Sequence, residues 1–345
     1  MRIRDYGIKI GDMKPGALNR ISDVPGVTVG HATIVNDRHN TGVTVVMPCK
    51  DNPFVSKLPC ASFVLNGFGK TAGLVQIDEL GTLETPIALT NTMNVGLVHD
   101  AMVEYMVRRC ERENVPIRSV NPVVCECNDA SLNDICHRAV KQEHVFAAIE
   151  SACAEFAEGA VGCGRGMTCH GLKGGVGSAS RIVPLDGKKY TLGVLVQTNH
   201  GSLRDLTIAG DRIGSRIQRQ LDADRPDKGS CIVILATDLP LSDRQLRRVI
   251  KRCSVGLARL GSYIGHGSGE VFIGFSTANR YAPDGDKRDV IPMEIINENR
   301  IDAAFRAAAE CTEEAVLNSM AEAEDVTGYS GKKRFSLKNF LGNEG

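Results

Sequence analysis

The chain has 345 residues, with 41 basic and 41 acidic side chains and a formal net charge of zero. This balance argues against a nucleic-acid partner, because no excess of positive charge is present to neutralise phosphates. The length is sufficient to bury a large apolar core in one domain, or two at most. Two features are unusual: Gly occurs 36 times and Trp is absent.

Membrane insertion and secretion are not expected. The longest apolar run, residues 231–236, is far shorter than the roughly twenty residues that a membrane helix needs. The first residues lack the apolar segment of a signal peptide, so we expect a cytoplasmic location. The twelve cysteines include no C-x-x-C pair. We therefore expect most of them to be reduced core residues.

The predicted elements alternate between strands and helices along the chain. Strands are predicted where β-branched or apolar residues run continuously: residues 42–47, 192–197, 231–236 and 271–275. Helices are predicted where apolar residues recur every three or four positions or where Ala and Glu dominate: residues 95–109, 137–157 and 302–323. Continuous apolar strands suit sheets covered on both faces, so the pattern predicts an α/β fold with helices outside sheets.

One polar segment interrupts this pattern. Residues 221–228 (LDADRPDK) lie directly before the apolar strand at 231–236. They predict an exposed loop, the kind of place where chains are cut. Their polarity alone favours an ordinary connection.

Two glycine-rich segments resemble nucleotide-binding motifs only in part. Residues 66–71 (NGFGKT) end like a P-loop, but Val64 occupies the position of the required first glycine. Residues 162–166 (GCGRG) lack the last glycine of a dinucleotide fingerprint and follow a helix-like stretch. Both segments are therefore predicted to be backbone turns, and a nucleotide-binding module is the least favoured interpretation.

No group of residues has the spacing of a known metal motif. Cys163, Cys169 and His170 could approach a metal, but no second ligand pair stands at zinc-site spacing and H-E-x-x-H is absent. We therefore expect no metal and no cofactor.

Ser230 is the serine with the most distinctive position. No G-x-S-x-G elbow occurs, which argues against an α/β-hydrolase. Ser230 instead follows Gly229 and opens the strand at 231–236. If the Gly229–Ser230 bond were cut, Ser230 would carry a free α-amine with a pKa of about 7.7–8.0. Such an amine can activate its own hydroxyl as a nucleophile. The alternative is that Ser230 is a plain turn residue.

A second constellation lies at residues 265–270 (GHGSGE), just before the strand at 271–275. Ser268 and Glu270 are two positions apart, so on an extended backbone they share one face and can form a hydrogen bond. The alternative is a glycine turn with Glu270 in solvent.

Eight stretches together resemble one family. They are ISDVPGVTVGHATI from residue 21, TGVTVV from 41, NDASLND from 128, EGAVGCGRGM from 158, KGGVGSASR from 173, GVLVQTNHG from 193, GSCIVILATDLPL from 229 and GSGEVFIGFSTAN from 267. They span nearly the whole chain. In them the sequence resembles the DmpA-type aminopeptidases, the P1 peptidase family that includes the β-aminopeptidases.

The resemblance implies a fold and a maturation step. The fold would be a four-layer αββα sandwich similar to N-terminal nucleophile hydrolases with altered connectivity, and to ornithine acetyltransferase. The chain would be a single-domain precursor, residues 1–345, that cuts itself before the serine of its G-S-x-x-V motif. Here that bond is Gly229–Ser230, which gives chains 1–229 and 230–345. Family members assemble as homo-oligomers of such cleaved pairs.

The resemblance also implies roles for individual residues. Ser230 would be the catalytic nucleophile, with Ser268 and Glu270 as catalytic partners that orient and tune it. Asn199 would donate to the oxyanion, and Glu126 would hold the free amino group of the substrate. Relatives often carry a tyrosine near the oxyanion, but this chain has none between Tyr105 and Tyr190. Asn128 or Ser131 stands in that region, and one lost oxyanion donor costs roughly 10²–10³ in rate.

The function implied is that of a serine aminopeptidase or amidase. Its substrates would be amides, esters or short peptides with a free N-terminal amino group, and it would need no metal, nucleic acid or membrane. An acyltransferase of the same fold is one alternative, and an uncleaved binding protein without activity is another. No motif encodes a preference for L-, D- or β-amino acids.

Overall fold

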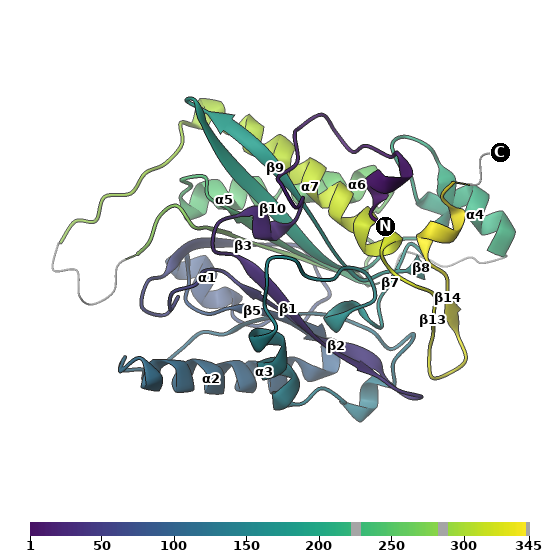
Figure 1. Ribbon diagram of the computed structural model, residues 1–345, viewed down its shortest axis with the longest axis horizontal. Coiled ribbons are helices and arrows are strands. Elements are labelled where there is room, and N and C mark those ends of the chain that lie inside the picture. The colour runs from purple at the N-terminus through teal and green to yellow at the C-terminus, as the bar shows by residue number, and fades with distance from the viewer. Residues whose placement is uncertain (222–228, 282–288, 343–345) are drawn as a thin grey trace.

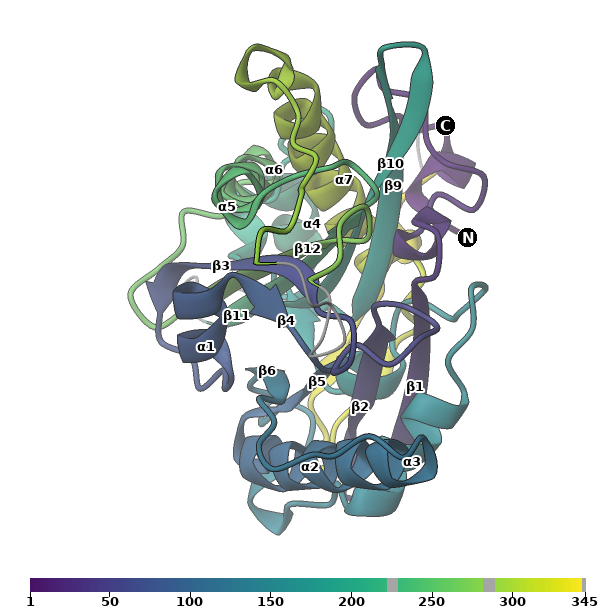
Figure 2. The same cartoon turned by 90° about the vertical axis from the view of Figure 1, so that its left-hand side faces the viewer.

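The computed structural model of the protein describes residues 1–221, 229–281 and 289–342 and has four layers, with two β-sheets stacked between two layers of helices (Figures 1 and 2). This αββα arrangement is the one that the resemblance implied. The polar segment predicted at 221–228 lies, from residue 222 onward, outside the described residues.

The larger sheet has six strands in the order β4-β3-β12-β11-β10-β9. These are β3 (Leu58–Gly67), β4 (Thr82–Leu83), β9 (Val176–Leu185), β10 (Lys188–Asn199), β11 (Ser230–Thr237) and β12 (Gly269–Ser276). Neighbouring strands are antiparallel, except that β11 and β12 run parallel. Every residue of β11 and β12 is buried, which confirms the prediction that these apolar runs are strands covered on both faces.

The smaller sheet has four strands in the order β1-β2-β5-β6. These are β1 (Thr28–Val35), β2 (Asn40–Met47), β5 (Ile87–Asn91) and β6 (Val123–Cys127), and only β5 and β6 are parallel to each other. Two short hairpins lie outside the main sheets. One joins β7 (Thr168–Cys169) to β8 (Leu172–Lys173), and the other joins β13 (Val326–Thr327) to β14 (Lys333–Arg334).

Helices cover the outer face of each sheet (Figure 2). The four-stranded sheet carries α2 (Val95–Arg112) and α3 (Gln142–Glu150), and the six-stranded sheet carries α5 (Asp243–Ile250), α6 (Cys253–Arg259) and α7 (Asp302–Ala321). Two further helices are α1 (Leu74–Leu80) and α4 (Ile213–Leu221). None of the described helices has the length and apolar character that a membrane span requires.

The helix predicted at 137–157 is shorter in the structure. It begins at Gln142 and ends at Glu150. The chain then becomes extended, because the backbone of Cys153 exchanges two hydrogen bonds with Val29 of β1, at 3.0 and 3.1 Å. Pairing with the sheet therefore ends the helix before its sequence pattern does.

Side chains of β11 alternate between two cores. Ile232 and Ile234 belong to the core between the two sheets, whereas Cys231 and Val233 belong to the core beneath the helices. Alternation along a strand places Ser230 on the side of Ile232, toward the four-stranded sheet. Of the cysteines, Cys136 and Cys153 are exposed and the others are buried, which confirms the prediction that most are core residues.

Helix α7 is an interior helix although it is rich in glutamate. Arg181 of β9 is fully buried and pairs with Glu310 at 3.0 Å and with Glu314 at 2.7 Å. Arg4 from the N-terminal segment pairs with Glu314 at 2.6 Å. These glutamates stay inside the fold because arginines from two other segments neutralise them.

Candidate active site

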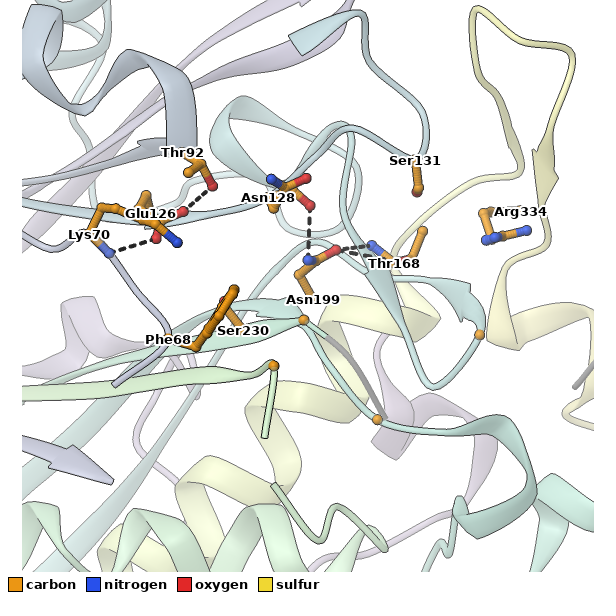
Figure 3. Close-up of a pocket in the computed structure, with 14 residues that line it drawn as sticks. Phe68, Lys70, Thr92, Glu126, Asn128, Ser131, Thr168, Asn199, Ser230 and Arg334 are labelled. Atoms are coloured by element: carbon orange, nitrogen blue, oxygen red, sulfur yellow. Dashed lines mark hydrogen bonds between the residues drawn. The ribbon is translucent and has the colours of Figure 1, made fainter. Parts of the chain in front are cut away.

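A pocket of about 510 Å³ lies where the end of β10 meets the start of β11 (Figure 3). Its labelled lining side chains come from segments far apart in the sequence: Phe68, Lys70, Thr92, Glu126, Asn128, Ser131, Thr168, Asn199, Ser230 and Arg334. The pocket therefore brings together five residues predicted from the sequence: Glu126, Asn128, Asn199, Gly229 and Ser230. Ser268 and Glu270 do not line it.

Ser230 is held at the head of β11 by both neighbouring strands. It pairs with Asn199 of β10 and with Gly269 of β12. The N–H of Gly269 also donates a hydrogen bond of 2.9 Å to the carbonyl oxygen of Gly229. The Gly229–Ser230 peptide is thus fixed at the pocket edge, and Ser230 is only 5% exposed.

Gly229 has a conformation that only glycine tolerates well. Its φ is +147°, and a Cβ added there would lie 1.7 Å from the carbonyl oxygen of Asn199. Any side chain at this position would push β10 and β11 apart at the pocket. The close approach of β10 is therefore a structural reason for glycine at this position.

The Asn199 amide is fixed at both ends. Its Oδ1 accepts the backbone N–H of Thr168 at 3.0 Å, and its Nδ2 donates to the carbonyl oxygen of Asn128 at 2.9 Å. A primary amide has two N–H groups, and the second has no acceptor among the described residues. The amide lies beside the Gly229–Ser230 peptide, since a Cβ at Gly229 would be 3.3 Å from Nδ2.

Glu126 places a buried carboxylate on the pocket wall. Its Oε1 accepts the backbone N–H of Lys70 at 2.9 Å, and its Oε2 accepts the hydroxyl of Thr92. The Lys70 ammonium instead lies 4.6 Å from the ring centre of Phe68. Within the described chain no ion pair neutralises Glu126, although it is only 2% exposed. A cationic group of a ligand can therefore supply its counter-charge.

Ser268 and Glu270 form a hydrogen-bonded pair on either side of Gly269, the β12 residue that pairs with Ser230. The Ser268 hydroxyl donates to Oε1 of Glu270, and both residues are fully buried. This confirms that the two share one face, whereas the alternative of a solvated Glu270 is wrong. The pairing of β12 with β3 shifts register between Glu270 and Val271, a bulge of the kind that often re-aims a side chain near an active site.

Several pocket residues were missed by sequence reasoning. Phe68 and Lys70 belong to the segment that failed as a P-loop, and Arg334 comes from the β13–β14 hairpin. The available signal for the first two was an aromatic residue between two glycines, Gly67 and Gly69, followed by a basic residue. No local pattern marks Arg334. Asn128 and Ser131 both line the pocket, so the region without the family tyrosine does face the site.

The metal-ligand set considered from the sequence is corrected by the structure. Cys169 and His170 lie together as expected, but the third residue beside them is His200. Cys163 packs in a different core, between the two sheets.

Comparison with known proteins identifies the family of this chain. The model of peptidase family S58 matches residues 19–334. The chain belongs to peptidase family S58. The resemblance to DmpA-type aminopeptidases is thereby confirmed, and the protein is a hydrolase of the serine aminopeptidase and amidase type.

The similarity of this S58 chain to its relatives covers almost its whole length. It is 37% identical over 358 aligned positions to the beta-peptidyl aminopeptidase BapA of Sphingosinicella xenopeptidilytica, covering 97% of this chain and 88% of the relative. A second beta-peptidyl aminopeptidase BapA, from Sphingosinicella microcystinivorans, is also 37% identical, with 96% and 88% covered.

Solved structures share the fold of this S58 chain. The PH0078 protein from Pyrococcus horikoshii OT3 superposes with a TM-score of 0.92 at 45% identity, covering 99% of this chain and 98% of the other. A Burkholderia sp. beta-aminopeptidase gives 0.89 at 41% identity, with 98% and 96% covered. The L-aminopeptidase D-Ala-esterase/amidase from Ochrobactrum anthropi, described as a variant of the Ntn hydrolase fold, gives 0.90 at 35%, with 97% and 95% covered.

Proposed function

We propose that this S58 peptidase activates itself by cutting the Gly229–Ser230 bond and then works as an aminopeptidase through the N-terminal Ser230. The observation that carries the proposal is the position of Ser230. It lies on the pocket wall between the Asn199 amide and the buried Ser268–Glu270 pair. The two chains would stay together as the single domain expected from the sequence.

Self-cleavage would begin with attack of the Ser230 hydroxyl on the carbonyl carbon of Gly229. The C–N bond breaks as a C–O ester bond forms, and the released nitrogen becomes the α-amine of Ser230. Water then hydrolyses the ester, leaving a carboxylate on Gly229 and the free hydroxyl on Ser230. The Gly269 N–H, which already bonds the Gly229 carbonyl oxygen, supports this step by polarising the carbonyl.

The mature site would use the same atoms on its substrate. The α-amine of Ser230 takes the hydroxyl proton, and the oxygen attacks the substrate carbonyl. The second N–H of Asn199 donates to the oxyanion that develops. The amine of the substrate leaves with the proton, and water releases the acyl group from Ser230. Ser268 and Glu270 would hold the α-amine in place.

Glu126 would select substrates that carry a free amino group. Its carboxylate is buried without a cationic partner among the described residues. The ammonium group of a substrate would pair with this carboxylate and neutralise its charge. Small peptides, amino-acid amides and esters fit this requirement. N-terminal β-amino acids are included in the proposal, because two relatives and one structural neighbour are named as enzymes for them.

Assembly and location complete the proposal. A homo-oligomer of cleaved pairs is expected from the family resemblance, and we place it in the cytoplasm. The cysteines are free thiols, in keeping with a reducing compartment.

The test compares purified wild type with Ser230→Ala on a denaturing gel and by mass spectrometry. Wild type should give two chains of 229 and 116 residues, the latter by subtraction from 345, and the variant should stay intact. Ser276→Ala is the matched control, since Ser276 is a buried serine at the far end of β12 and should not affect cleavage. Wild type that stays intact after long incubation contradicts the proposal.

A second measurement tests the role of Glu126. Aminoacyl nitroanilides with free and acetylated amines are compared on wild type and on Glu126→Gln. Wild type should prefer the free amine, and the variant should lose most of this preference. Equal rates on both substrates for wild type would remove the role given to Glu126.

A further inference from the structure

Three buried side chains of types that can bind metals lie together, next in the chain to residues that line the pocket. Cys169 and His170 lie at the β7–β8 turn, and His200 follows the last residue of β10. One ligand atom from each lies within 4.8 Å of the other two, and all three side chains are buried. The two segments are joined by a hydrogen bond of 2.7 Å from the His170 N–H to the carbonyl oxygen of His200.

His200 is the anomaly that points to a ligand. It is 1% exposed, and neither of its ring nitrogens has a hydrogen-bond partner in the part of the chain that the structure describes. A buried polar atom without a hydrogen-bond partner is unfavourable, because it has lost its water without a replacement. His31 shows the usual solution, because its ring nitrogens contact the Thr44 hydroxyl at 2.9 Å and the Ala157 carbonyl oxygen at 3.0 Å.

His170 is oriented as a metal ligand. Its Nδ1 lies 3.0 Å from the carbonyl oxygen of Ser202. A carbonyl oxygen only accepts, so the proton belongs on Nδ1 and Nε2 carries the lone pair. A backbone carbonyl in this role is the usual support of a zinc-bound imidazole. Gly201 makes room for the ring, because a Cβ there would lie 2.5 Å from it.

We propose that Cys169, His170 and His200 bind one zinc ion. One thiolate and two imidazoles are a ligand set that Zn²⁺ prefers, and water would fill the fourth position. Binding would release the thiol proton of Cys169 to solvent as the S–Zn bond forms. The ligand atoms around a tetrahedral zinc ion lie about 3.5 Å apart. The three ligand atoms here lie within 4.8 Å of one another, so their distances need to shorten by only about 1 Å.

The zinc would have a structural task. The proposed ligands are flanked in the chain by residues that line the pocket. Thr168 and Gly171 flank Cys169 and His170, and Asn199 and Gly201 flank His200. The ion would therefore fasten the β7–β8 turn to the end of β10, the two segments that hold the Asn199 amide. No reaction step passes through the metal, so the site is independent of the proposed self-cleavage.

Metal content is the direct test. Wild type and the non-cleaving Ser230→Ala are purified without chelator and measured by mass spectrometry of the metals. About one zinc per chain is expected in both. The ion is then removed and replaced by Co²⁺, which should give a thiolate-to-cobalt charge-transfer band and the visible bands of a tetrahedral centre. Folded wild type that holds no zinc and gives no such bands overturns the proposal.

Variants assign the ligands. Cys169→Ser and His200→Phe should bind zinc at least about tenfold more weakly, while Cys60→Ser and His31→Gln should bind it as wild type does. Cys60 is a matched buried cysteine in the other core. Unchanged zinc affinity in both ligand variants overturns the assignment. If a ligand variant fails to fold, the cobalt spectrum of wild type decides.

Discussion

The hydroxyl of Ser268 donates to the carboxylate of Glu270 at a fully buried site, and the residue between them, Gly269, pairs with Ser230. A hydrogen bond to a charged acceptor in a buried site is strong and orients both partners. The pair is thereby fixed relative to the backbone of Ser230, the proposed nucleophile. Its Ser268 end is also anchored, because the Asn66 amide donates to the Ser268 carbonyl oxygen at 2.5 Å.

Glu270→Gln should lower kcat by about 10²-fold while KM for an aminoacyl amide changes little. The amide keeps the shape of the side chain but removes the charge that would hold the α-amine of Ser230. Ser268→Ala should have a similar effect. Because the two residues act as one unit, the double variant should be little worse than either single one. Losses that simply multiply in the double variant contradict this coupling.

Asn199→Asp should lower kcat by about 10²–10³-fold, as expected for a lost oxyanion donor. The aspartate keeps Oδ1, which accepts the Thr168 N–H, but it removes both amide N–H groups, including the one that donates to the Asn128 carbonyl oxygen. Rates are measured on cleaved protein, because the same donor is expected to act in self-cleavage. A kcat close to that of wild type would remove Asn199 from the oxyanion site.

Arg334→Gln should change the preference between peptides and amides. In Figure 3, Glu126 and Arg334 lie on opposite sides of the pocket, with Asn199 between them. A short peptide bound by its amine at Glu126 could present its carboxylate to Arg334. We expect kcat/KM for a dipeptide to fall about tenfold relative to the matching amino-acid amide. Arg334→Lys should restore part of the loss, whereas equal losses on both substrates contradict the prediction.

Asp129 should make stability depend on pH. Burial raises the pKa of this carboxyl to about 6, although Thr41 and Asn133 donate hydrogen bonds to it. The folded state therefore binds this proton more tightly than the unfolded state does. This tighter proton binding adds at most about 3 kcal/mol to the free energy of unfolding. The gain is fully present below about pH 4 and is lost as the pH rises through about 6.

The measurement for Asp129 is the Tm of wild type and Asp129→Asn at pH 4.5 and pH 7.5. Wild type should be more stable relative to the variant at pH 4.5 than at pH 7.5. The exposed Asp211→Asn serves as control and should shift both values equally. Parallel pH profiles of wild type and Asp129→Asn contradict the prediction.

Much of the fold could be predicted from the sequence because local residue patterns indicate several of its strands and helices. The apolar runs that became β10, β11 and β12 needed no partner to be recognised, since their composition reflects burial on both faces. The helix around Gln142 was overextended, because pairing of Cys153 with β1 ends it and such long-range pairing has no local signal.

The residues of the site likewise include some that local sequence patterns reveal and others that they do not. Ser230, Ser268 and Glu270 were found because each stands at the start of an apolar strand, where a polar residue is conspicuous. Arg334 was missed because only folding brings its hairpin to the pocket. His200 was missed as a neighbour of Cys169 because the two are separated by a whole strand pair, β9 and β10.

The order of strands in the larger sheet has a consequence for the timing of maturation. Strands β11 and β12, from the second proposed chain, are inserted between β3 and β10, from the first. During synthesis, which runs from the N-terminus, the neighbours of Ser230 on β12 leave the ribosome last among these strands. A nascent chain therefore holds the Gly229–Ser230 bond before it holds the groups expected to cut it. Premature cleavage would release an incomplete fragment, and if the chain cuts itself as proposed, this order would protect against that loss.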